Sequence, residues 1–147
     1  IPITIPTFTK IWIANIEAIP TAERTAKKKH VEGAAASGSV RRLLREIAEY
    51  PNSFGPLGPN DERIQTERYT LCMGFGKTWN TVQRQRFPEE EVDDVLEEVR
   101  ASLLRRGRHR TQWEVGSAVE PSRLVDLLLE RGLTRDKDPF AVALVLT

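Results

Sequence analysis

The sequence predicts an α/β fold in which helices flank a mixed β-sheet. Between Trp79 and Leu133 the hydrophobic periodicity changes from strand to helix and back twice, with proline or glycine at the boundaries. Residues 69–75 read Tyr-Thr-Leu-Cys-Met-Gly-Phe, a short apolar run typical of a buried strand. The length of 147 residues and the hydrophobic content of 39% suit a single domain with a sizeable core.

The chain up to residue 66 is predicted to consist of helices and loops. A first helix is predicted from apolar residues that recur at helical spacing and end at Pro20: Phe8, Ile11, Trp12, Ile16 and Ile19. A second helix is predicted with Ser39 as its N-cap and with an apolar stripe: Val40, Leu43, Leu44 and Ile47. The run 51–61 is dense in proline, glycine, asparagine and aspartate, so we expect a surface loop there.

Two short segments of this region each have two interpretations. The basic run Lys27–His30 is interpreted as a solvated helix face, with an anion-binding patch as the alternative. Residues 33–38 are small and flexible, which is typical either of a loop or of a hinge between larger parts of the chain.

Residues 79–133 are predicted to form strand, helix, strand and helix in that order. Strands are predicted at 79–87 and 111–116, and helices at 88–106 and 121–131. Each helix begins at a proline and is followed by a glycine, the residues that favour those two positions. Two strands joined by a long helix form a crossover unit, so we expect both strands to lie parallel in one sheet, with the right-handed connection that such units adopt.

A hairpin and a last strand complete the predicted sheet. The buried run 69–75 is joined to the next strand through Gly76-Lys77-Thr78, a glycine-bearing connection that suits an antiparallel hairpin. The apolar run 140–146 is predicted to be the final strand. We expect a core made mostly of buried residues from these elements: Leu96, Val99, Leu103, Trp113, Val115, Leu124, Leu128 and Val142.

The balance of charges argues against two classes of partner. With 22 basic against 21 acidic residues, no overall field favours nucleic acid or an anionic membrane, so we expect neither as a partner. No apolar run reaches the length of a transmembrane helix. A single cysteine, Cys72, excludes an intrachain disulfide and fits a reducing compartment, so we expect a cytoplasmic protein.

The sequence contains no catalytic constellation. His30 and His109 lie far apart, and neither has a second histidine or a Cys-x-x-Cys nearby, so we expect no metal site. Residues 74–78 resemble the end of a phosphate-binding loop, but residue 71 is leucine where such a loop needs its first glycine, and a strand follows. His109 lies among arginines at a helix end, where capping and solvation account for it. We therefore assign no catalytic or cofactor-binding residue.

A pattern of strand, turn and helix in the second half resembles a known family. Trp113-Glu114-Val115-Gly116 is a tryptophan-containing strand that ends in glycine, Pro121 begins a helix, and residues 128–133 close it in a Gly-Leu turn. Together with Asn80-Thr81-Val82 and the acidic helix that follows, this pattern resembles the N-terminal half of tandem acetyltransferases of the GNAT superfamily. The resemblance covers residues 79–147, whereas residues 1–78 match no family pattern.

The resemblance implies a GNAT-like half-domain, with acetyl-CoA as the cofactor of the full-length protein and N-acetyl transfer as its reaction. In this family a Gln/Arg-x-x-Gly-x-Gly/Ala loop between a strand and a helix holds the pyrophosphate of acetyl-CoA at the helix N-terminus. The nearest segment here, His30–Ala35, has histidine in place of glutamine or arginine. We therefore expect this chain alone to be inactive and to bind acetyl-CoA weakly or not at all.

Three functions from different classes remain open. The chain is the N-terminal portion of an acyltransferase whose catalytic half is absent, or a module that binds a small molecule or peptide in a cleft lined by Trp79 and Trp113, or a non-catalytic protein that dimerises through a sheet edge. It has no initiator methionine and ends in an apolar run, which favours a piece of a longer chain. A C-terminal catalytic half or a second copy is therefore the expected partner.

Overall fold

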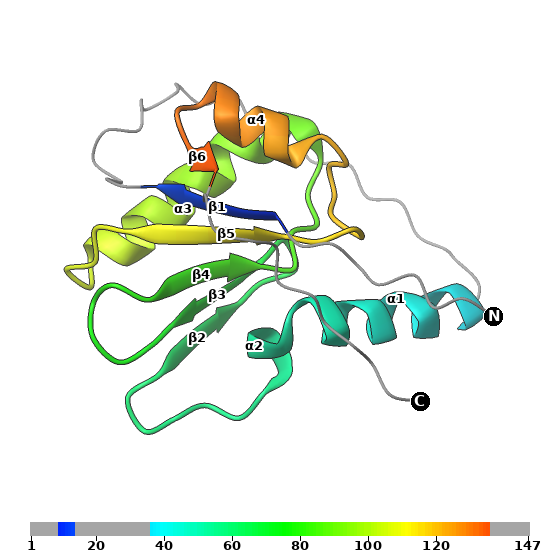
Figure 1. Ribbon diagram of the computed structural model, residues 1–147, viewed down its shortest axis with the longest axis horizontal. Helices are drawn as coiled ribbons and strands as arrows, with labels where there is room; N and C mark the ends of the chain where they lie inside the picture. Colours follow the sequence, from blue (N-terminus) through cyan, green and yellow to red (C-terminus); the bar gives the residue numbers. More distant parts are fainter. Residues whose placement is uncertain (1–8, 14–35, 136–147) are drawn as a thin grey trace.

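The computed structural model describes residues 9–13 and 36–135, which form a mixed sheet of six strands in the order β2-β3-β4-β5-β1-β6 (Figure 1). The strands are β1 (Thr9–Ile13), β2 (Glu62–Gln65), β3 (Thr70–Met73), β4 (Asn80–Gln83), β5 (Thr111–Val115) and β6 (Thr134–Arg135). The helical elements are α1 (Ala36–Glu49), α2 (Pro51–Phe54), the 3-10 turn η2 (Glu89–Glu91), α3 (Val92–Leu104) and α4 (Leu124–Glu130). The predicted class, a mixed sheet with flanking helices, is confirmed.

The pairing of the strands agrees with the predicted hairpin and crossover. Strands β3 and β4 are antiparallel neighbours, joined by the connection 74–79. Strands β4 and β5 are parallel neighbours, joined through η2 and α3. The remaining pairs, β2 with β3, β5 with β1 and β1 with β6, are antiparallel. The single parallel pair therefore lies in the middle of the sheet.

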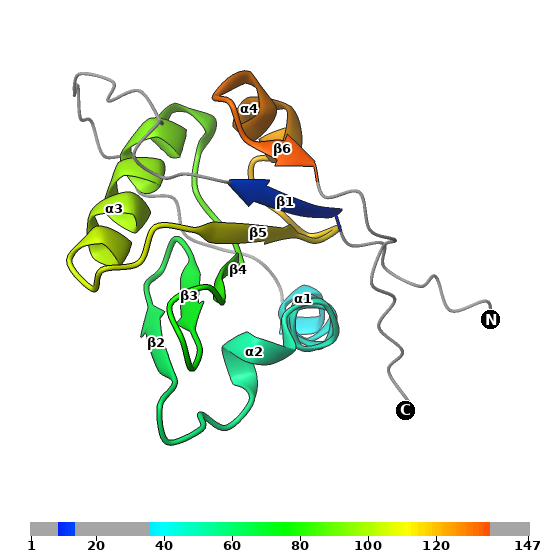
Figure 2. The ribbon, with the colours of Figure 1, turned by 60° about the vertical axis from the view of Figure 1, so that its left-hand side comes forward.

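The two faces of the sheet are covered differently. One face is apolar and packs against α3 and α4, while α1 and α2 lie on the other side (Figures 1 and 2). Seven of the eight expected core residues are buried there: Leu96, Val99, Leu103, Trp113, Val115, Leu124 and Leu128. The eighth, Val142, and the predicted strand 140–146 lie outside the described residues, as do the basic run 27–30 and the segment 30–35.

The expected N-terminal helix is wrong where the structure describes it. Residues 9–13 form strand β1, which pairs with β5 over five positions from Thr9↔Val115 to Ile13↔Thr111. Threonine and isoleucine are stiff at the first side-chain torsion and favour strands. The pairing with β5 therefore decides the conformation of this segment. The helical spacing that predicted a helix depended partly on residues outside 9–13.

Several predicted boundaries also need correction. Strand β4 ends at Gln83, not at residue 87, because Arg84 has a positive φ of 55° that ends regular pairing. Pro51–Phe54 of the expected loop form α2, which fits a proline at a first helical position. Residues 62–65, assigned to the helical and loop region, are the edge strand β2. Ser39 lies inside α1 rather than capping it, since the helix begins at Ala36.

Helix α1 is oriented opposite to the usual amphipathic helix. Its apolar stripe faces away from the sheet, with four side chains between 43% and 57% exposed: Val40, Leu43, Leu44 and Ile47. Its buried residues are instead the glutamates Glu46 and Glu49. The apolar pattern predicted the helix correctly but would have placed its buried face on the wrong side.

Within the described chain, no helix is long and apolar enough to cross a bilayer.

A bidentate ion pair between Arg131 and Asp93 links the end of α4 to α3. Arg131 donates to the Asp93 carboxylate at 2.5 Å through Nε and at 2.9 Å through Nη2. The hydrogen bonds from Arg131 lower the pKa of Asp93. A carboxyl with a lowered pKa stabilises the fold above its unfolded pKa, and this stability is lost as the pH falls through the folded pKa.

We expect Asp93→Asn to lower the free energy of unfolding at pH 7 by less than about 1 kcal/mol, because the pair is partly exposed and screened. The difference between variant and wild type should be smaller at pH 3 than at pH 7, because the wild-type carboxyl becomes protonated as the pH falls below its unfolded pKa and through its lowered folded pKa. Urea unfolding at pH 7 and pH 3 measures both values. A difference that stays constant over this range would contradict the assignment.

Candidate functional site

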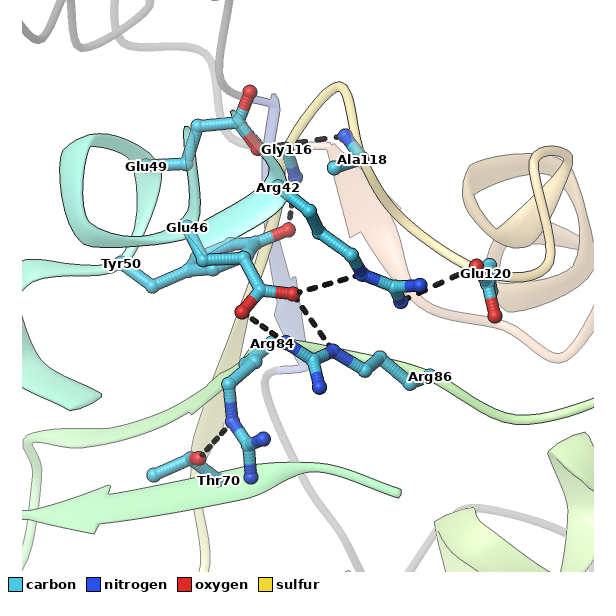
Figure 3. A network of polar contacts seen from close by, with 10 residues as sticks. All are labelled: Arg42, Glu46, Glu49, Tyr50, Thr70, Arg84, Arg86, Gly116, Ala118 and Glu120. Carbon is cyan, nitrogen blue, oxygen red and sulfur yellow. Dashed lines mark hydrogen bonds and ion pairs between the residues drawn. The ribbon is translucent and has the colours of Figure 1, made fainter. Parts of the chain in front are cut away.

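The candidate site lies at the carboxyl ends of the parallel strands β4 and β5. Ligands of open α/β sheets bind in the crevice outside the carboxyl ends of such strands. Helix α1 and the connection from β5 to α4 reach this end from two sides (Figure 3). The site is therefore built from the polar side of the sheet, α1 and residues 116–120.

The crevice between β4 and β5 is closed by the Gln85 side chain. The two strands pair only at Thr81↔Gln112 and Val82↔Trp113. Beyond these positions the Gln85 amide Nε2 donates to the carbonyl oxygens of Val82 at 3.0 Å and Glu114 at 3.1 Å, so that it bridges the separating strands.

A second closure follows a few residues further along both segments. The Glu120 N–H donates to the Gln85 carbonyl at 3.1 Å, and the Phe87 N–H donates to the Glu120 carbonyl at 3.2 Å. Arg86 and Glu120 accordingly form a parallel bridge. The space between the strands is thus filled by this chain's own amide and backbone groups.

A buried carboxylate, Glu46, is the centre of an ion cluster beside this closure. The Glu46 residue is 1% exposed. Its carboxylate accepts hydrogen bonds from Arg86, through Nε at 2.7 Å and through Nη2, and from Arg42 Nε at 3.3 Å. Arg42 also forms an ion pair with Glu120 at 3.2 Å (Figure 3). We call Arg42, Glu46, Arg86 and Glu120 the ion cluster; it ties α1 to both strand-end segments.

One turn further along α1, two more buried residues hold the segment after β5. The Glu49 carboxylate accepts hydrogen bonds from the Ser117 hydroxyl and from the Ala118 N–H at 3.4 Å. The Tyr50 hydroxyl accepts the Gly116 N–H at 3.0 Å, and burial raises the pKa of Tyr50. A Cβ on Gly116 would lie 2.1 Å from a Glu49 oxygen and 2.7 Å from the Tyr50 hydroxyl, so a larger residue here would displace both side chains.

The polar face of the sheet continues this network beneath α2. The Ser53 hydroxyl donates to the Gln83 side-chain oxygen at 3.0 Å, and the Gln83 amide donates to the Glu114 carboxylate. Arg84, at its positive φ, donates from Nε to the Thr70 hydroxyl at 3.0 Å, and burial lowers its pKa. These groups are saturated by one another, which is typical of a structural network.

An open cleft adjoins the ion cluster. Its volume is about 490 Å³, and it is lined by three arginines of α1 and three residues after β5: Arg41, Arg42, Arg45, Ala118, Val119 and Glu120. Arg42 is paired within the ion cluster, whereas Arg41 and Arg45 form no ion pair with a described residue. The cleft therefore has an excess of positive charge and suits a small anionic group.

Two kinds of reactive group among the described residues are potential metal ligands and the thiol of Cys72. No group of three histidine, cysteine or carboxylate residues there has the arrangement of a metal site. Cys72 is buried, and burial raises the pKa of its thiol to about 11, so the nucleophilic thiolate is scarce at neutral pH.

The structure separates two residues that one hypothesis placed together. Trp113 is fully buried in the core, so it does not line an open cleft, whereas Trp79 lies just before β4 and is 38% exposed. Residues 74–78 lie in the β3–β4 connection and are followed by strand β4, where a phosphate-binding loop is followed by a helix.

The sequence analysis missed the ion cluster and the cleft. Glu46 and Glu49 look like solvated residues of an amphipathic helix, and Arg86 looks like a strand residue. The apolar stripe of α1 was the local signal in this part of the sequence. It indicated that the polar side of the helix is exposed, whereas that side is buried. Compared with protein-family models, curated proteins and solved structures, the chain has no match.

Proposed function

We propose that this chain is the N-terminal, GNAT-like portion of an acetyltransferase and that it contributes ligand binding instead of catalysis. The parallel β4–α3–β5 unit with a tryptophan in β5 is consistent with the pattern that suggested this family. The observation that carries the non-catalytic role is the closure of the crevice by Gln85 and Glu120. A cofactor at this position would have to displace both groups.

The start of α3 supports the same proposal. Residues 84–91, which connect β4 to α3, contain no glycine that would let the backbone approach a pyrophosphate. Glu89, Glu90 and Glu91 form the turn at the helix start, and their negative charge opposes the attraction of the helix N-terminus for an anion. The same position in an active enzyme of this class would need the opposite properties.

The cleft beside the ion cluster gives the chain its proposed ligand, a small carboxylate or phosphate. Arg41 and Arg45 are spaced one helical turn apart on the same side of α1, so both guanidinium groups can reach one anion. In a full-length acetyltransferase this cleft would hold an acidic part of the acceptor substrate. The alternative is a stand-alone binding module, in which the same cleft is the whole function.

The sequence encoded after Thr147 distinguishes these two functions. A following segment with Gln/Arg-x-x-Gly-x-Gly/Ala, and acetyl transfer by the protein that contains it, would support the acetyltransferase. A stop codon after residue 147 would leave only the binding module. The sheet-edge dimer has less support, because β2 is four residues long and presents Glu62, Arg63 and Gln65, features that discourage edge pairing.

Ligand binding by the cleft is tested by NMR titration of the chain with inorganic phosphate and with succinate. We expect chemical-shift changes at Arg41, Arg45 and Val119, and about a tenfold weaker affinity in Arg45→Ala, the loss of one charge-assisted contact. Arg135→Ala, an exposed arginine at the far edge of the sheet, is the matched control and should leave the affinity unchanged. Equal weakening in both variants would show general charge attraction, and the cleft would then have no specific role.

A further inference from the structure

The β3–β4 connection (residues 74–79) and the connection from α3 to β5 (residues 105–110) are about thirty residues apart in sequence. They lie together at the amino ends of β4 and β5, opposite the candidate site. Arg108, in the connection from α3 to β5, donates to the carbonyls of Gly76 at 2.9 Å and Gly74 at 3.1 Å, and to the Asn80 side chain at 2.7 Å. The Asn80 amide donates in turn to the carbonyls of Lys77 at 2.9 Å and Arg110 at 2.8 Å. Arg108 and Asn80 thus hold the β3–β4 hairpin against residues 105–110.

The hairpin presents two aromatic side chains to solvent. Phe75, near its tip, is 82% exposed, and Trp79 is 38% exposed. The indole of Trp79 lies against the backbone of Gly74, because a Cβ there would be 2.4 Å from the ring carbon Cε3. The ring is therefore held in place on one side while part of it stays accessible, which is the geometry of a stacking platform.

The two connections that Arg108 holds together are rich in basic residues. Residues 74–80 and 105–111 together contain five basic side chains, Lys77, Arg105, Arg106, Arg108 and Arg110, and no carboxylate. Arg106 forms an ion pair with Glu62, with a shortest contact of 2.6 Å, and Arg108 donates hydrogen bonds to the carbonyls of the hairpin. The other three basic residues, Lys77, Arg105 and Arg110, form no ion pair with a described residue.

We propose that these residues form a binding surface for single-stranded nucleic acid. Its members are the aromatic residues Phe75 and Trp79 and the basic residues Lys77, Arg105 and Arg110; we call it the hairpin surface. Bases would stack on the two aromatic rings, a contact that every base can make, and phosphates would pair with the three cations. The surface lies at the opposite end of β4 and β5 from the cleft, so it does not depend on the function proposed for that cleft.

The chemistry of the hairpin surface favours nucleic acid over a membrane surface. Membrane insertion requires a continuous apolar area, whereas in these two connections only Phe75 is largely exposed and the neighbouring sequence is basic. In the hairpin sequence Lys77 stands between Phe75 and Trp79, and this order of ring, cation and ring suits a strand in which bases and phosphates alternate. The even overall charge of the chain predicted no nucleic-acid partner. That expectation considered the sum of the charges, whereas the fold brings two basic connections together, in which Glu62 pairs only with Arg106 among the five basic residues.

Fluorescence anisotropy with labelled 15-nucleotide poly-dT and poly-rU tests the proposal on the 147-residue chain. We expect binding in low salt that weakens as salt rises, with a log–log slope near −2 if three phosphates are neutralised at about 0.7 each. Phe75→Ala and Trp79→Ala should each weaken binding about tenfold, the loss of one stacking contact. Lys77→Glu should weaken binding and flatten the salt slope, whereas Arg135→Glu, the same charge change elsewhere, should have a much smaller effect.

Three results would overturn the proposal. The first is the absence of oligonucleotide binding by wild-type chain whose circular dichroism shows it to be folded. The second is equal loss of affinity in Lys77→Glu and Arg135→Glu together with no loss in Phe75→Ala, which would reveal only non-specific charge attraction. The third is binding to phosphatidylserine vesicles, but not to oligonucleotides, that Phe75→Asp abolishes. Phe75 is so exposed that its variants should fold, which keeps the test independent of any effect of Trp79→Ala on stability.

Discussion

Replacing Glu46 by alanine is expected to lower the free energy of unfolding by about 1.5–3 kcal/mol, the effect of losing charge-assisted hydrogen bonds to a buried acceptor. The loss is smaller than for a fully buried pair, because the side chains of Arg86 and Arg42 are 30% and 38% exposed and remain solvated. Glu46 is buried, and its carboxylate is the acceptor for both Arg86 and Arg42. Without it, two guanidinium groups at the end of the sheet lose their common acceptor, and α1 loses its hydrogen bonds with Arg86 in the segment after β4. Urea denaturation followed by circular dichroism measures the change.

Glu46→Gln and Glu97→Ala serve as controls for this prediction. Glutamine keeps the size of the side chain and one acceptor oxygen, so Glu46→Gln should be less destabilising than Glu46→Ala. Glu97 pairs with Arg100 on the surface of α3 at 3.2 Å, and its removal should change stability by less than about 1 kcal/mol. If Glu46→Ala were as mild as Glu97→Ala, the ion cluster would not hold α1 in place.

Replacing Leu96 by alanine is expected to lower the free energy of unfolding by about 2–5 kcal/mol, through lost burial and the cavity left behind. Leu96 lies on the face of α3 that packs against the apolar side of the sheet, in the same core as Trp113 and Leu128. The measurement is again urea denaturation, with the m-value as a check that the unfolded state is unchanged.

Leu43→Ala is the matched control for Leu96→Ala, because it is the same substitution on an exposed helix face. Leu43 is on the outward stripe of α1, so its replacement should change stability by about 0.5 kcal/mol or less. A large loss for Leu43→Ala with a small loss for Leu96→Ala would mean that the two helices are oriented the other way.

Elements with strong local signals could be predicted from the sequence. Helix α3 has apolar residues at three- and four-residue spacing, and α3 and β5 were predicted with boundaries close to the observed ones. Strand β1 was not predicted, because its five residues are stabilised by a ladder with β5 about one hundred residues away. A pairing over such a distance leaves no periodicity of its own in a short segment.

The candidate site could not be predicted from the sequence, and the reason is the orientation of α1. A stripe such as Val40, Leu43 and Leu44 normally marks the buried face of a helix. Here the ion pairs of Glu46 and the contacts of Glu49 bury the polar face instead. The hairpin surface could not be predicted either. Arg108 joins two connections that are distant in sequence, and neither sequence indicates that it contacts the other.

The most direct test of the central claim, that the β4–β5 crevice is closed to a cofactor, is isothermal titration calorimetry of the 147-residue chain with acetyl-CoA. The account predicts no heat of binding up to millimolar acetyl-CoA, in wild type and in Glu89→Gln alike, since Gln85 and Glu120 would still occupy the crevice. Micromolar binding by the wild-type chain that Gln85→Glu abolishes would contradict it.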